Sequence, residues 1–141
     1  MLKQFKILFI DDDPIAKALI EAIFDFYRDD FHLNSIERIY AENLKEAAEK
    51  LDESINEGNF INGILCDIQL IEETGFDFLQ LYNNEYLKDY PKTVVSLITA
   101  HISDNTIEDF KNFPFAYKIF ERPIDVKKLK ILIKEIIRRH S

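Results

Sequence analysis

Residues 7–14 read Ile7-Leu8-Phe9-Ile10-Asp11-Asp12-Asp13-Pro14. Four consecutive large apolar residues predict a short strand that is buried on both faces, as in a parallel sheet covered by helices. Proline fits the first turn of a helix, where its missing N–H is not needed. The three aspartates therefore lie in the turn between a buried strand and a helix, at the carboxyl end of that strand.

Short apolar runs and longer amphipathic stretches alternate along the rest of the chain, which is typical of βαβ units and a parallel sheet. We expect strands at residues 7–10, 35–40, 64–66, 94–99 and 117–120. Helices are expected after Pro14, Asn43, Gly75, Ser103 or Asp104, and Asp125. The first helix carries apolar residues at helical spacing, namely Ile15, Leu19, Ala22, Ile23 and Phe26. The pattern predicts a doubly wound α/β fold of five strand–helix units.

The composition limits the classes of partner. The 141 residues carry 18 basic and 26 acidic side chains, which gives a net charge of −8. A phosphate backbone would repel such a chain, so we expect no nucleic-acid binding. No stretch resembles a signal peptide or is apolar enough to cross a membrane, and the single cysteine, Cys66, cannot form an internal disulfide. These features predict a cytoplasmic protein that does not bind membranes.

Polar residues follow four of the five expected strands. The aspartates of residues 11–13 follow the first strand, Asp67 follows the third, Thr99 ends the fourth and Arg122 follows the fifth. If these strands are neighbours, the groups converge, because open α/β sheets bind ligands at the carboxyl ends of their strands. Carboxylates there form a hard oxygen site suited to Mg²⁺, and an aspartate can attack phosphorus. Taken singly, each residue has a simpler explanation as a helix cap, a strand end or a surface cation.

Five segments together resemble the receiver domain of bacterial two-component response regulators, over nearly the whole chain. They are residues 7–14, Leu65-Cys66-Asp67-Ile68, Gly75, Leu97-Ile98-Thr99-Ala100 and Arg122-Pro123-Ile124-Asp125. The resemblance implies a flavodoxin-like three-layer sandwich with a five-stranded parallel sheet in the order 2-1-3-4-5. It also implies a stand-alone regulator similar to the chemotaxis type, with residues 1–141 as one receiver domain and no output domain.

The resemblance also assigns roles to individual residues. Asp67 would accept a phosphoryl group from a phosphohistidine of a histidine kinase or phosphotransfer protein. Together with Asp67, Asp12 would bind Mg²⁺ (or Mn²⁺) directly, Asp11 would bind it through water, and the backbone carbonyl of Gln69 would be a further ligand. Around the phosphoryl group, Thr99, Ala100 and Arg122 would hold its oxygens and act in the switch. Gln69 and His101 would flank the attacking water and set the lifetime of the phosphoryl group. These reactions phosphorylate and dephosphorylate the chain itself, so we do not expect the chain to be an enzyme that acts on an external substrate.

Three positions depart from the family pattern. Arg122 replaces the usual lysine, Ile71 replaces a common proline, and Ile119 stands where an aromatic switch residue is frequent. Because arginine is longer and planar, the first change alters the geometry of any ion pair. A pseudo-receiver that binds partners without phosphorylation is therefore a second hypothesis. A small haloacid-dehalogenase-like phosphatase with Asp11 as nucleophile is a third, but it leaves Asp67 unexplained.

The last expected helix concentrates basic residues on this acidic chain. They are Lys127, Lys128, Lys130, Lys134, Arg138 and Arg139. The helix is either an ordinary solvated surface or a face that docks an unknown downstream protein, and a homodimer is a further hypothesis.

Overall fold

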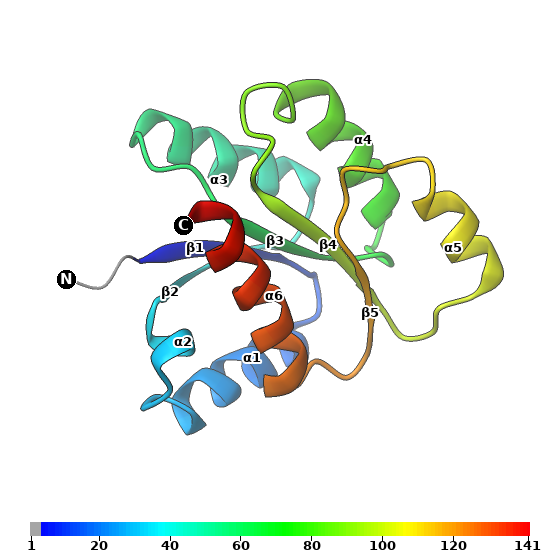
Figure 1. The fold of residues 1–141 in the computed structure, drawn as a ribbon. Coiled ribbons are helices and arrows are strands. Elements are labelled where there is room, and N and C mark those ends of the chain that lie inside the picture. Colours follow the sequence, from blue (N-terminus) through cyan, green and yellow to red (C-terminus); the bar gives the residue numbers. More distant parts are fainter. Residues whose placement is uncertain (1–3) are drawn as a thin grey trace.

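The computed structural model describes residues 4–141. The strands are β1 (Phe5–Ile10), β2 (Ile36–Ala41), β3 (Gly63–Asp67), β4 (Val94–Thr99) and β5 (Ile119–Glu121). The helices are α1 (Pro14–Phe26), α2 (Phe31–Asn34), α3 (Leu44–Asn56), α4 (Gly75–Glu85), α5 (Asp104–Phe110) and α6 (Val126–His140). Figure 1 shows these elements as a central sheet with helices on both sides.

The sheet is parallel throughout, and its strands lie in the order β2-β1-β3-β4-β5. Alternate side chains of β1 enter different cores, because successive residues of a strand point to opposite faces. Ile7 and Phe9 pack with α1, α2 and α6 on one face. Leu8 and Ile10 pack with α3 and α4 on the other, and the end of α5 joins this second core. The doubly wound three-layer fold and the strand order expected from the sequence are therefore confirmed.

The apolar stripe expected in the first helix is mostly not its buried face. Ile15 and Phe26 are 75% and 79% exposed, and Leu19 is also exposed. The residues of α1 that enter the core are Ala16, Ile20, Ile23 and Phe24. Only Ile23 belongs to both sets. The helix carries apolar residues on two faces, and spacing alone cannot tell which of them meets the sheet.

Two local differences from the sequence expectation lie at element ends. A short extra helix, α2, follows α1, with the carboxylate of Asp30 accepting hydrogen bonds from the first backbone N–H groups. Lys130 of α6 pairs with Asp30 at 2.6 Å and ties this turn to the last helix. The fifth strand begins at Ile119 rather than Tyr117. Backbone hydrogen bonds from Tyr117 N and to Lys118 O nevertheless extend the pairing with β4.

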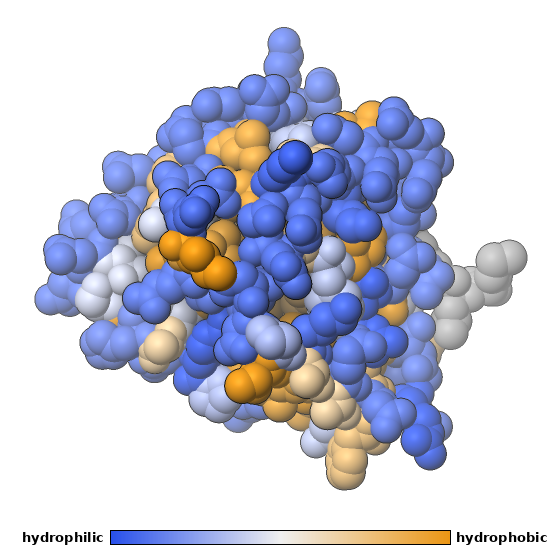
Figure 2. All heavy atoms as spheres, turned by 180° about the vertical axis from the view of Figure 1, so that it is seen from behind, coloured by the Kyte–Doolittle hydropathy of each residue, from blue (hydrophilic) through white to orange (hydrophobic). Residues whose placement is uncertain are grey.

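The surface is mainly hydrophilic, as Figure 2 shows for the face seen from behind, where apolar groups emerge only in separate small areas. Within residues 4–141, none of the helices has the length and apolar character needed to cross a bilayer.

Candidate functional site

The carboxyl ends of β1, β3, β4 and β5 meet at one edge of the sheet. Asp11 and Asp12 follow β1, and Asp67 is the last residue of β3. The register places Ile10 beside Cys66, so the two acidic strand ends are adjacent. Carboxylate oxygens of the three aspartates lie within 4.8 Å of one another. The strand ends therefore bring together the three carboxylates that the sequence singled out.

Backbone amides hold each of the three carboxylates in place. Asp11 and Asp67 each accept a hydrogen bond from the backbone N–H two residues further along the chain, at 2.9 and 3.0 Å. Asp12 accepts one from the N–H of Ile71 at 2.7 Å, in the loop after β3. The loop position at which a proline is common in the resembling family thus donates a hydrogen bond that proline could not provide. Asp13 is the N-cap of α1, so its carboxylate serves the helix rather than the cluster.

Arg122 is the cation of the cluster, and it contacts two of the aspartates. Its Nη2 atom lies 2.5 Å from Asp11 Oδ2 and 3.2 Å from Asp67 Oδ2. The sequence suggested that Arg122 pairs with Asp67 or with the phosphoryl group, and did not anticipate the closer contact with Asp11. The backbone N–H of Arg122 donates to the carbonyl oxygen of Thr99 at 2.8 Å. The peptide bond between Arg122 and Pro123 is cis.

Burial and charge act in opposite directions on the site. Burial raises the pKa of the Asp67 carboxyl, and the neighbouring charge of Asp11 adds to the rise, whereas the N–H of Gln69 and the guanidinium of Arg122 oppose it. For Arg122, burial alone would lower the pKa, but the carboxylates of Asp11 and Asp67 reverse this and raise it. The guanidinium is therefore fully charged at neutral pH, and it partly offsets three clustered negative groups.

The donor set of the cluster suits a hard divalent cation. Three carboxylates on adjacent strand ends offer oxygen ligands of the kind that Mg²⁺ and Mn²⁺ prefer. The fit agrees with the sequence expectation for Asp11, Asp12 and Asp67. The further roles of Gln69, Thr99 and Ala100 remain predictions.

No family model matches the sequence, and no curated protein matches it either. Solved structures do match. A two-component response regulator from Cytophaga hutchinsonii superposes with a TM-score of 0.82 at 19% identity, covering 96% of this chain and 98% of that one. A CheY-like response regulator receiver domain protein from Methanospirillum hungatei JF-1 superposes with a TM-score of 0.73 at 21% identity, covering 98% of each chain. The chain has the receiver-domain fold of response regulators. A beryllofluoride-activated NtrC4 receiver domain dimer shares it, with a TM-score of 0.71 at 24% identity, over 96% of this chain and 98% of that one.

The remaining predicted site residues of this receiver fold lie around the cluster. Thr99 ends β4 and is 5% exposed; its hydroxyl donates a long bond of 3.5 Å to the carbonyl oxygen of His101. Ala100, Gln69 and His101 are exposed. The His101 ring lies 3.6 Å from the carboxylate of Glu121, at the end of β5. Gln69 and His101 therefore flank the strand ends from two different loops and are open to solvent.

Gly75 sets how closely α4 approaches the acceptor strand of the receiver fold. A Cβ atom there would lie 3.0 Å from the carbonyl oxygen of Asp67, the Cα of Ile68 and a methyl group of Leu97. The N–H of Gly75 also donates to the carbonyl oxygen of Ile68 at 2.9 Å. A side chain at this position would push the start of α4 away from the residue that carries the carboxylate.

The usual aromatic switch position of the receiver fold is aliphatic here. Ile119 packs against the core formed with α3 and α4, whereas Tyr117 and Phe120 pack against the opposite core. Tyr117 and Phe120, the aromatic residues nearest to Ile119 in this part of the sequence, therefore contact the other core.

Most of the basic residues of α6 have partners within the chain. Lys128 Nζ donates to the carbonyl oxygens of Glu121 and Pro123, at 2.5 and 2.8 Å, and so fixes the backbone on both sides of Arg122. Arg138 and Arg139 both pair with Glu135. Within the described residues, Lys127 and Lys134 have no such ion pair. The sequence left Lys128 open as part of either a solvated surface or a docking face, and gave no sign of its contact with two backbone carbonyls.

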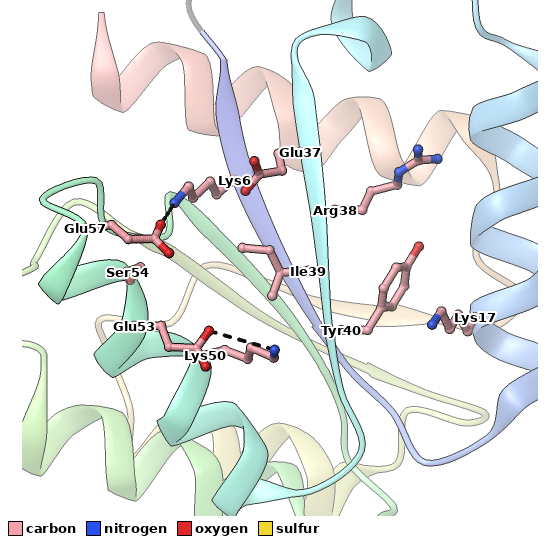
Figure 3. A pocket seen from close by; sticks show the side chains of 10 residues that line it. All are labelled: Lys6, Lys17, Glu37, Arg38, Ile39, Tyr40, Lys50, Glu53, Ser54 and Glu57. Atoms are coloured by element: carbon pink, nitrogen blue, oxygen red, sulfur yellow. Dashed lines mark hydrogen bonds and ion pairs between the residues drawn. The ribbon is translucent and has the colours of Figure 1, made fainter.

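A pocket lies along the edge strand β2, away from the acidic cluster (Figure 3). Two ion pairs line it: Lys6 binds Glu57 at 2.9 Å, and Lys50 lies 3.8 Å from Glu53. Charged side chains along an edge strand oppose pairing with another chain.

Proposed function

We propose that this chain is a phosphoacceptor receiver that takes a phosphoryl group on Asp67. The observation that carries the proposal is a buried aspartate at the end of a central strand, placed between two further carboxylates and a guanidinium. A carboxylate oxygen of Asp67 attacks the phosphorus of a phosphohistidine, and the bond from phosphorus to the ring nitrogen breaks. The nitrogen keeps the electron pair, and an acyl phosphate forms on the aspartate.

Residues of the chain would support this step from several sides. Asp11 and Asp12 would hold a divalent cation, which offsets negative charge on the entering phosphoryl group. Arg122 has the forked donor set that fits phosphoryl oxygens. The Gln69 N–H holds one oxygen of Asp67, so the carboxylate is oriented before the phosphoryl group arrives. We further propose that the chain is located in the cytoplasm and does not act as an enzyme on an external substrate.

The exposed stripe of α1 supports docking of a protein phosphodonor, either a histidine kinase or a phosphotransfer protein. Ile15, Leu19 and Phe26 lie on one side of the helix, and Ile15 is only two residues from the N-cap Asp13. Exposed apolar groups on a surface this hydrophilic are typical of protein contacts. We expect Ile15→Ser to slow transfer from a protein donor while leaving transfer from a small phosphodonor unchanged.

A small phosphodonor with Mg²⁺ and intact-protein mass spectrometry test the proposal directly. We expect the mass of one phosphoryl group to be added to the natural protein and not to Asp67→Asn. The exposed Asp109→Asn, on α5, is a matched control that should still be modified. An adduct that persists in Asp67→Asn would contradict the proposed acceptor.

A pseudo-receiver is the second candidate function, because Arg122 already engages Asp67 and the switch position holds Ile119. It predicts no adduct in the same experiment and partner binding that does not depend on a phosphodonor. The phosphatase alternative has less support. Asp11, its required nucleophile, is the aspartate that Arg122 contacts more closely, at 2.5 Å against 3.2 Å for Asp67.

A further inference from the structure

The guanidinium of Arg122 and a divalent cation need the same oxygen atoms. Arg122 Nη2 contacts Asp11 Oδ2 and Asp67 Oδ2, two of the three carboxylates grouped at the site. The second oxygen of each carboxylate is already bonded to a backbone N–H. In both Asp11 and Asp67, the guanidinium therefore holds the oxygen other than the one bonded to a backbone N–H.

The contacts of Arg122 with Asp11 and Asp67 are strong because both carboxylates are largely buried. The side chains of Asp11 and Asp67 are 13% and 11% exposed, so solvent screens their charges poorly. A guanidinium cannot be deprotonated in proteins, so it does not release the carboxylates by losing a proton. A cation entering the site has to break a charge-assisted hydrogen bond rather than fill an open position.

The geometry points to Arg122 as an internal counter-ion that a divalent cation must displace before Asp67 can react. This inference rests on the proposed receiver function and adds a regulatory step to it. While the guanidinium stays in place, it holds Asp67 Oδ2, one of the two oxygens that could attack phosphorus. Occupation of the site by a cation would release that oxygen. Phosphorylation then requires a higher concentration of the divalent cation than in a receiver whose basic side chain leaves Asp11 free.

The surrounding backbone confines the movement to the side chain of Arg122. Its N–H is bonded to the carbonyl oxygen of Thr99, and Lys128 binds the carbonyls of the residues on either side. Displacement therefore requires rotation of the side chain alone. Once released from Asp11, the forked guanidinium is close enough to turn toward the phosphoryl group on Asp67, whose oxygens it fits in a bidentate manner.

Arg122→Lys separates competition for these oxygens from a simple effect of charge. Lysine keeps the positive charge but lacks the fork and the reach of arginine. Competition predicts that Arg122→Lys binds Mn²⁺ at least about tenfold more tightly than the natural protein. The reason is that the variant loses the charge-assisted contacts of the guanidinium with the carboxylates, which oppose binding of the ion. A pure charge effect predicts unchanged affinity in Arg122→Lys and a gain only in Arg122→Met.

Mn²⁺ binding is measured from the electron paramagnetic resonance signal of the free ion, with no phosphodonor present. Arg139→Lys is the matched control, because Arg139 also pairs with a carboxylate but contacts Thr93, next to the start of β4 and far from the cluster. We expect the control to keep the natural affinity. Equal affinity in Arg122→Lys and the natural protein, or no Mn²⁺ binding in any of them, would overturn the inference.

A crystal structure of the natural protein with Mn²⁺ provides a test that does not depend on folding of the variants. We expect Arg122 Nη2 to have left Asp11 Oδ2, and an intact contact beside a bound ion would refute displacement. The mass measurement on Asp67 stays separate. An adduct on Asp67 together with unchanged Mn²⁺ affinity in Arg122→Lys would reject the counter-ion and keep the receiver function. Tighter Mn²⁺ binding in Arg122→Lys without any adduct would keep the counter-ion and reject phosphorylation.

Discussion

Gly75→Ala is expected to disturb the acceptor site through packing, without touching any charged group. The added Cβ would meet three atoms at 3.0 Å, and two of them are backbone atoms of Asp67 and Ile68, which cannot rotate away. Forcing extra volume into a packed site costs about 1–3 kcal/mol. Alanine recovers part of this, up to about 1 kcal/mol, through its better helix propensity. Taking the middle of the packing cost, about 2 kcal/mol, and subtracting up to about 1 kcal/mol leaves an expected net loss of about 1–2 kcal/mol.

Thermal unfolding followed by circular dichroism checks this magnitude. For a chain of this length, 1 kcal/mol shifts Tm by about 2–4 °C, so Tm should fall by about 2–8 °C. Gly58→Ala is the control, since Gly58 has a φ of 73° and nothing within 4 Å of the added Cβ. Its cost of about 1–2 kcal/mol comes from the left-handed backbone alone.

The rate of phosphorylation at Asp67 should distinguish the two glycine variants. We expect Gly75→Ala to slow phosphorylation by a small phosphodonor, because the backbone of Asp67 shifts, and Gly58→Ala to leave the rate unchanged. If Gly75→Ala kept both the Tm and the rate of the natural protein, the steric argument would be refuted.

Three further predictions concern other parts of the chain. The hydroxyl of Ser96, fully buried in β4, has no hydrogen-bond partner among residues 4–141, so Ser96→Ala should raise Tm by removing a group whose burial costs about 1–3 kcal/mol. The Lys130 ammonium lowers the pKa of the Asp30 carboxyl, so the folded state binds fewer protons here than the unfolded one. The stabilisation is thus present above the unfolded pKa of about 3.9 and is lost as pH falls through the lower folded value. Asp30→Asn should lower the free energy of unfolding at pH 7, measured by urea titration, and the difference from the natural protein should vanish in strong acid. Gln69→Ala and His101→Ala should change the rate at which a phosphorylated sample loses its phosphoryl group, measured by mass, and unchanged rates would show that these residues do not contact the attacking water.

The strands and the acidic strand ends were predictable because each depends on a short, local signal. A mainly apolar run such as residues 94–99 has few alternatives in a parallel sheet, and the structure gives β4 the same bounds. The start of α1 was predictable from Pro14. Its buried face was not, because Ile15 and Leu19 repeat with the same period as Ala16 and Ile20. Which stripe is buried depends on how the helix is rotated against the sheet, and that is fixed by tertiary packing.

The position of Arg122 after β5 could also be predicted from the sequence, but the partner of its guanidinium could not. Strand order places the backbone of Arg122 beside Thr99 and thus near Asp67. Whether the side chain stops at Asp67 or reaches Asp11 depends on its length and on the three negative charges around it. A carboxylate cluster of low exposure attracts the nearest cation, and arginine can contact two carboxylates at once. Arginine in place of the family's usual lysine therefore moves the counter-charge toward the residues that would hold the metal. Metal affinity, rather than the identity of the acceptor, is thus the property in which this chain should differ most from a receiver with lysine at this position.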